Sequence, residues 1–253
     1  MPNKQRIVGF AALGGAALIV GYLGFALGGF DSMVQGRARD IAQLRNQEWV
    51  NSWFGVSMLQ YPNDLVTYQQ ILAEVRPDLV IETGTYTGGL TLYLSSLLDY
   101  INPDGKIISV DIDTKPAREN FANLEIHDSG RLVDRIQLIE ASSTDPKTLE
   151  TIRGQIRDDS KVLIILDSLH TRENVARELE MYAPLVSKNS YLIVNDTHLD
   201  RWYPESGPEN APYGGAGRAV ADFVANDQRF QVDRSRDRFL VSCAPGGFLK
   251  RVN

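Results

Sequence analysis

The stretch that decides the fold is VIETGTYTGG, residues 80–89. It begins as an apolar strand, ends that strand with Glu82, and runs through Gly84, Gly88 and Gly89 into a segment with helical spacing. In doubly wound α/β sheets, ligands bind outside the carboxyl ends of the strands, where glycines let the backbone approach the ligand. The stretch therefore predicts a cofactor site. Its glycine spacing differs from the dinucleotide pattern G-x-G-x-x-G, and a tight turn without a ligand is the alternative.

Strand-like and helical segments alternate on both sides of this stretch. Runs rich in β-branched residues predict strands at 79–82, 106–110, 136–139, 162–166 and 191–194. Helices are expected at 64–74, 89–100, 116–128, 145–157 and 171–185, and a long loop over 201–217 is followed by a helix at 218–226 and strands at 230–233 and 239–243. This alternation predicts an α/β fold with a doubly wound, mostly parallel sheet. The long loop is the place where we expect substrate contacts.

Polar residues follow the second and third predicted strands at the same edge of the sheet. Asp111 comes directly after the second strand, where a carboxylate accepts hydrogen bonds from ribose hydroxyls in nucleoside-binding sheets. Ser142 follows the third strand and is predicted to face the adenine side of a cofactor.

Two aspartates and an asparagine follow the fourth and fifth predicted strands. Asp167 directly follows the fourth, and Asn195 and Asp196 directly follow the fifth. The topology brings these side chains together, and two carboxylates repel each other unless a cation lies between them. Because oxygen ligands suit magnesium, we predict Asp167 and Asp196 as metal ligands and Asn195 as the third. Solvated loop acids that cap helices are the alternative.

The sequence contains three histidines. His170 and His198 each lie within a few residues of a predicted metal ligand, where an imidazole can take a proton from a bound hydroxyl. We predict His170 as the general base, and His127 as a structural or solvated residue.

Composition narrows the function further. The chain has 253 residues, a formal net charge of -6 and a single cysteine, Cys243. The acidic balance argues against broad nucleic-acid binding. One cysteine forms no intrachain disulfide and no thiolate zinc cluster, and we interpret it as a small apolar residue.

The amino-terminal segment predicts a membrane anchor. Residues 7–30 carry no charge, and at about 1.5 Å per residue such a helix exceeds the roughly 30 Å hydrocarbon layer. We predict an uncleaved anchor over 1–30, a linker and connecting helix over 31–60, and one domain over 61–253; a cleaved secretory signal is the alternative. The pair Gly24 and Gly28 permits homo-oligomerisation through the anchor, although glycine is also simply common in membrane helices.

Four motifs together resemble the cephalosporin hydroxylase family, which includes rhamnosyl O-methyltransferases. They are IETG (81–84), DSLHT (167–171), NDT (195–197) and PGGFLKR (245–251), and the resemblance extends from Tyr61 to the carboxyl end. It implies the Rossmann-like fold of class I S-adenosylmethionine-dependent methyltransferases, with magnesium held by Asp167, position 195 and Asp196. This chain has Asn195 where the family usually has glutamate. A more distant similarity to catechol O-methyltransferases implies a base three residues after the first metal aspartate, the position of His170.

The resemblance implies a magnesium-dependent O-methyltransferase that acts on a hydroxyl of a sugar, glycolipid or other small molecule. The cofactor is then expected to contact a set of residues that begins in the glycine loop: Glu82, Gly84, Tyr86, Gly88, Asp111, Ser142 and Asp167. Asp167 and His170 are the expected catalytic residues. An anchor suggests a membrane-bound acceptor, and the cytoplasmic origin of S-adenosylmethionine places the domain on the cytoplasmic side.

Two other functions stay open at this stage. An iron-dependent hydroxylase needs two histidines and one carboxylate, which His170, His198 and Asp196 would supply. A membrane-tethered scaffold that keeps the fold without catalysis is permitted by Asn195.

Overall fold

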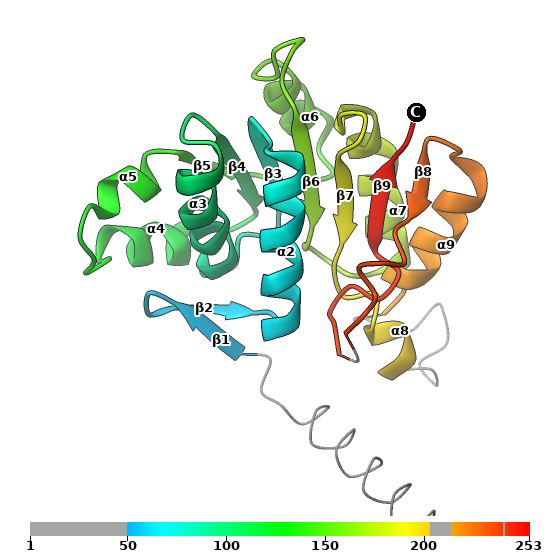
Figure 1. Cartoon of the computed structure of the whole chain (residues 1–253), viewed down its shortest axis with the longest axis horizontal. Coiled ribbons are helices and arrows are strands. Elements are labelled where there is room, and N and C mark those ends of the chain that lie inside the picture. Colours follow the sequence, from blue (N-terminus) through cyan, green and yellow to red (C-terminus); the bar gives the residue numbers. More distant parts are fainter. Residues whose placement is uncertain (1–49, 203–213, 240) are drawn as a thin grey trace, which may run out of the picture. The chain divides into compact units, whose positions relative to one another are not determined.

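The structure is a computed structural model that describes residues 50–202, 214–239 and 241–253 (Figure 1). The predicted anchor and most of the predicted linker lie outside these residues, as does most of the predicted loop at 201–217. Within the described ranges, no helix combines the length and the apolar character needed to cross a membrane.

The described residues form a seven-stranded sheet in the order β5-β4-β3-β6-β7-β9-β8. Its parallel strands are β3 (Leu79–Thr83), β4 (Lys106–Asp111), β5 (Ile136–Glu140), β6 (Val162–Leu166) and β7 (Tyr191–Val194). β9 (Phe248–Arg251) runs antiparallel between β7 and β8 (Phe230–Val232). The chain proceeds from β3 outward to β5 and then returns to β6, so the strand order reverses between β3 and β6. This confirms the predicted mostly parallel sheet and predicts a ligand crevice beside β3.

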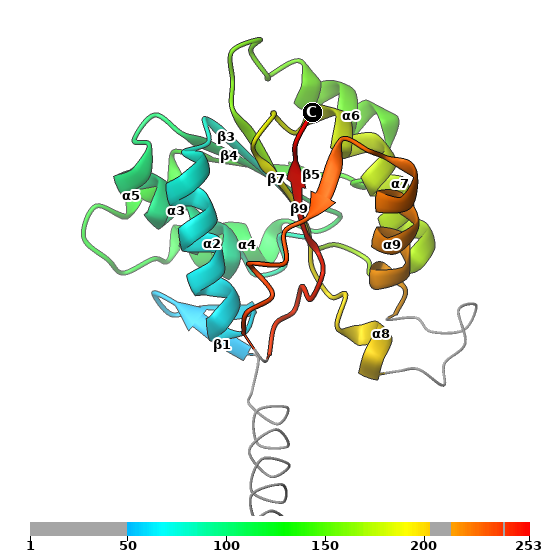
Figure 2. The ribbon, with the colours of Figure 1, turned by 45° about the vertical axis from the view of Figure 1, so that its right-hand side comes forward.

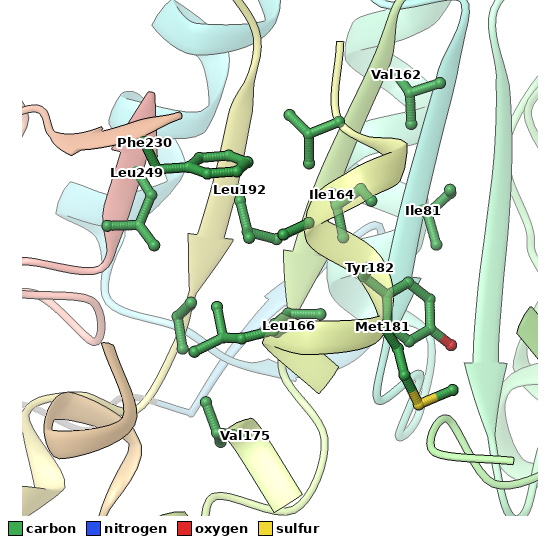
Figure 3. Packing of buried hydrophobic residues seen from close by; sticks show 14 of the residues in the cluster. Ile81, Val162, Ile164, Leu166, Val175, Met181, Tyr182, Leu192, Phe230 and Leu249 are labelled. Atoms are coloured by element: carbon green, nitrogen blue, oxygen red, sulfur yellow. The ribbon is translucent and has the colours of Figure 1, made fainter. Parts of the chain in front are cut away.

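Helices cover both faces of this sheet (Figure 2). Side chains alternate between the faces because successive strand residues point in opposite directions. Ile81, Ile108 and Ile164 pack toward α6 (Pro146–Arg153), α7 (Arg172–Tyr182) and α9 (Ala216–Asn226), in the cluster shown in Figure 3. Val80 and Ile165 pack toward α2 (Pro62–Val75) and α3 (Gly89–Ile101). Two apolar layers therefore hold the sheet rigid beneath the site.

A β-hairpin precedes this core. The connecting helix predicted over 31–60 is therefore wrong for the residues that form this hairpin. β1 (Val50–Trp53) pairs antiparallel with β2 (Val56–Leu59). Phe54 and Gly55 both have positive φ, which is the geometry of a tight hairpin turn. The Trp53 ring packs edge-on against Tyr93 of α3, so tertiary contacts fix the extended conformation.

The strand predicted at 239–243 is also wrong. The backbone N–H of Cys243 donates to Asp64 of α2 at 2.7 Å, and the Cys243 carbonyl accepts from the His198 N–H, so the backbone of Cys243 bonds to neighbouring segments rather than to a strand partner. The chain then turns at Gly246, and the last strand is β9.

The helices predicted at 116–128, 145–157 and 171–185 are shorter than expected, whereas α3 extends one residue beyond the predicted 89–100. The one expected at 116–128 is α4 (Lys115–Ala122), which a separate short helix follows, α5 (Ser129–Val133). A short 3-10 segment, η1 (Ala183–Leu185), follows α7, and α8 (Leu199–Trp202) follows β7.

Candidate active site

A cavity of about 890 Å³ opens at the carboxyl ends of the parallel strands. This is near the upper end of the roughly 300–1,000 Å³ typical of small-molecule sites. Five of the predicted cofactor residues line it: Gly84, Tyr86, Asp111, Ser142 and Asp167. His170 and Asp196 line it as well, so together with Asp167 three of the four predicted metal and base residues lie in the same crevice as these cofactor residues.

The loop after β3 forms one wall of this crevice and lies against the end of β6. Gly84 has φ +85°, and a Cβ at this position would lie 2.0 Å from the carbonyl oxygen of Asp167. The Asp167 N–H donates to the Thr83 carbonyl at 2.9 Å, so the loop and the residue after β6 hold each other in place. Glycine is therefore required here for close packing of two backbones.

Asp111 is tied to the same loop. Its Oδ2 accepts a 2.8 Å hydrogen bond from the Tyr86 N–H, and the Tyr86 side chain is 56% exposed beside it. A carboxylate has further acceptor sites for the hydroxyls of a ribose. Ser142 lies across the crevice on an exposed turn, 3.0 Å from the Thr144 hydroxyl. Three residues further on, Asp145 caps α6 by accepting a hydrogen bond from the Lys147 N–H.

Glu82 and Gly88 do not line the cavity. Gly88 is the N-cap residue of α3, and a Cβ at this position would meet the ring of Phe121. Glu82 is fully buried, and its Oε2 accepts hydrogen bonds of 2.5 Å from Thr91 and Ser109. Burial raises the pKa of Glu82 to about 7. The structure thus places Glu82 behind the loop.

Asp167, His170 and Asp196 form a compact group. One ligand atom from each lies within 4.8 Å of the others, and His170 Nε2 is 3.0 Å from Asp196 Oδ2. Desolvation in the crevice and the neighbouring Asp196 carboxylate raise the pKa of Asp167 well above its usual range, while Asn195 opposes that shift. Asp196 has positive φ, which is uncommon for a residue other than glycine and is found at functional sites.

The donor chemistry of this group fits a divalent cation. Two carboxylates and an imidazole converge in a crevice, and a cation there would relieve the repulsion between the acids. Asn195, the predicted third ligand, is 1% exposed, and its Oδ1 accepts a 2.7 Å hydrogen bond from the Tyr68 hydroxyl. His170 completes the compact group instead, so it is a candidate ligand as well as a candidate base.

Two residues of this site were missed in the sequence. Gln60, at the end of β2, donates from Nε2 to Asp167 Oδ2 at 3.0 Å, and Tyr68 of α2 contacts Asn195. The glycine between Trp53 and the β-branched Val56 is a hairpin signal, but no pattern indicates that the hairpin packs against α3 and the glycine loop.

The other histidines have different surroundings. His127 lies between α4 and α5 with its side chain 94% exposed. His198 is buried, its Nδ1 lies 3.0 Å from the Cys243 carbonyl, and burial lowers its pKa. With Asp196 and the buried Cys243 it forms a second group of candidate ligands. Among the described residues, no such group contains both His170 and His198.

Comparison with known proteins finds relatives among O-methyltransferases. A rhamnosyl O-methyltransferase of Mycobacterium bovis (strain BCG / Pasteur 1173P2) is 31% identical over 211 residues, which cover 81% of this chain and 80% of the relative. One of Mycobacterium leprae (strain TN) is 32% identical over 207 residues, covering 79% of this chain and 82% of that protein. A solved structure of CmcI with Mg and SAM has a TM-score of 0.58 at 21% identity, covers 80% of this chain and 77% of its own, and shares the fold. The profile of one family matches residues 46–252, and the chain therefore belongs to the rhamnosyl O-methyltransferase/CmcI family.

Proposed function

We propose that this chain transfers the methyl group of S-adenosylmethionine to a hydroxyl of a sugar-containing acceptor, at the crevice beside β3, with Mg²⁺ bound by the carboxylates. The observation that carries the proposal is the single cavity in which Asp111 and the group of Asp167, His170 and Asp196 meet. A nucleoside site and a hard-cation site in one crevice are what a metal-assisted methyl transfer requires.

Family membership gives the reaction class: the chain is an S-adenosylmethionine-dependent O-methyltransferase. The curated relatives are rhamnosyl O-methyltransferases, which supports a sugar hydroxyl as the acceptor. The cation supplies Lewis-acid polarisation of that hydroxyl when it is bound.

The chain's own residues have distinct roles in this proposal. Asp111 and the Gly84 loop hold the nucleoside and methionine parts of the cofactor, and Ser142 lies on the adenine side. The short contact between His170 Nε2 and Asp196 favours the tautomer that carries its proton on Nε2. His170 Nδ1 is then the atom that accepts the proton of the acceptor hydroxyl. Asp167 and Asp196 would hold the cation, which would supply the polarisation and orientation of the acceptor hydroxyl.

We also place the apolar segment 7–30 in a membrane as a single-pass anchor, with the catalytic domain in the cytoplasm. Its length and lack of charge support this, as does the cytoplasmic supply of the cofactor. Membrane fractionation, followed by protease treatment of sealed vesicles, tests it. Cross-linking of the full chain against a Gly24→Leu, Gly28→Leu double variant tests the accompanying homo-oligomer.

The two other functions lead to different observations. A hydroxylase requires His170, His198 and Asp196 around one iron, and the described residues do not bring this set together as one ligand group. A scaffold without catalysis would fold normally and bind no cofactor.

Calorimetric titration of the purified full chain with S-adenosylmethionine, with and without Mg²⁺, tests the proposal. We expect micromolar binding that Asp111→Ala weakens by about 10- to 150-fold, the range for a hydrogen bond to a charged group. Asp159→Ala, which removes an exposed carboxylate, is the control and leaves the affinity unchanged. A folded wild-type chain that binds no S-adenosylmethionine would refute the proposal and favour the scaffold.

A further inference from the structure

Gln60 lies at the end of the hairpin, outside the sheet that supplies the acids. Its side chain is buried, with 2% of the residue exposed, and Nε2 donates to Asp167 Oδ2 at 3.0 Å. The two residues are 107 positions apart in sequence. A buried amide that contacts a candidate metal ligand is the kind of outer partner that orients such ligands.

The Gln60 side chain has a second neighbour within the same site. Its Oε1 lies 3.5 Å from the Tyr68 hydroxyl, which donates to Asn195 Oδ1 at 2.7 Å. Tyr68 and Asn195 are each 1% exposed. Three uncharged side chains thus link the hairpin, α2 and the end of β7 beside the Asp167 carboxylate.

The hairpin holds Gln60 in a defined position. The Asn51 amide donates to the Gln60 backbone carbonyl at 2.7 Å, and Trp53 Nε1 donates to Ser96 of α3 at 3.0 Å. The Thr87 hydroxyl of the glycine loop donates to the Ser57 carbonyl of β2. Because β1 is attached to α3 and β2 to the glycine loop, the hairpin fixes Gln60 relative to the crevice.

We propose that Gln60 is a positioning residue of the metal site: it holds one oxygen of Asp167 so that Asp167 and Asp196 share a single Mg²⁺. The inference rests on the magnesium part of the proposed function. An Asp167 carboxylate without this partner would rotate freely or turn away from Asp196, and the cation would lose one correctly oriented ligand.

Mg²⁺ titration of the full chain by calorimetry tests this without an acceptor. Gln60→Leu removes the side-chain NH2 donor and C=O acceptor at similar volume, and we expect the Kd for Mg²⁺ to rise about 10- to 100-fold, the usual effect of removing an outer partner. Gln70→Leu is the matched control, because Gln70 lies on α2 and bonds to the exposed Arg238. It should bind Mg²⁺ as the wild type does.

Gln60→Glu provides a second measurement, which still decides the question if Gln60→Leu fails to fold. This variant replaces the N–H donor with a carboxylate, which repels the Asp167 carboxylate when no cation is bound. Because Mg²⁺ relieves that repulsion, it should raise the Tm of the variant more than that of the wild type.

Three outcomes are distinguishable. Wild-type binding of Mg²⁺ together with equal affinity in Gln60→Leu would overturn this inference alone. An equal Mg²⁺-dependent rise of Tm in the wild type and in Gln60→Glu would do the same. A wild type that binds S-adenosylmethionine but no Mg²⁺ would overturn the metal part of the proposed function, and this inference with it.

Discussion

Replacing Gly84 with alanine is expected to destabilise the domain by about 2–5 kcal/mol. The new Cβ would lie 2.0 Å from the carbonyl oxygen of Asp167 and 2.5 Å from its carbonyl carbon, and both are backbone atoms that no rotamer change can move. Relieving such an overlap costs about 1–3 kcal/mol. The φ of +85° at Gly84 adds about 1–2 kcal/mol for an L-residue in the left-handed region.

Thermal and urea unfolding of the full chain would measure this loss. For a domain of this size, 1 kcal/mol corresponds to about 2–4 °C in Tm, so we expect a decrease of about 4–20 °C. Gly154→Ala is the matched control, because Gly154 has a helical φ of -63° and the nearest atoms to its added Cβ lie 3.6 and 3.7 Å away. It should be neutral or stabilise by up to about 1 kcal/mol. A Gly84→Ala variant within about 1 kcal/mol of the wild type would show that the loop does not depend on this close packing.

Two further predictions concern stability. Burial raises the pKa of Glu82 from about 4.5 to about 7, so the folded chain binds more protons than the unfolded chain between these values, and its free energy of unfolding decreases as pH rises. In urea unfolding, the free energy of unfolding of Glu82→Gln minus that of the wild type should therefore increase by about 3 kcal/mol from pH 4.5 to pH 7. A difference that does not change with pH would contradict the raised pKa. Asp145→Ala removes the cap of α6 and should cost about 0.5–2 kcal/mol while the affinity for S-adenosylmethionine stays unchanged; an unaltered unfolding midpoint would show that the contact to the Lys147 N–H contributes nothing.

The parallel part of the fold could be predicted because its signals are local. Each buried strand is a short run of β-branched residues, and the segments between these runs have helical lengths. The hairpin and β9 could not be predicted in this way. The run at 239–243 is as apolar as a strand, but Asp64 binds the Cys243 N–H, and Asp64 is distant in sequence. Tertiary contacts there override the local preference.

The residues of the site likewise fall into those that local sequence signals predict and those that only tertiary contacts bring together. Asp111, Asp167 and Asp196 lie at or just after the carboxyl ends of strands, and a doubly wound topology places these ends at one edge, so their convergence could be deduced. Gln60 and Tyr68 meet Asp167 and Asn195 across 107 and 127 positions respectively, and no spacing rule contains such contacts. The prediction that Glu82 contacts the cofactor failed to place its side chain, because a strand pattern does not show whether a side chain near the strand's end points into a crevice or behind the loop.

The residues that sequence reasoning missed also bear on the charge of the site. Asp167 and Asp196 together carry two negative charges when ionised, and a divalent cation between them leaves the group neutral. Buried charge that has no counter-charge is costly, so a third acid at position 195 would leave a net charge of -1 around the cation. Asn195 supplies an amide there instead, while the Tyr68 hydroxyl and the Gln60 amide provide hydrogen bonds without adding charge. In this arrangement the acids set the charge that a Mg²⁺ ion would match, and the neutral side chains set the geometry in which the acids are presented.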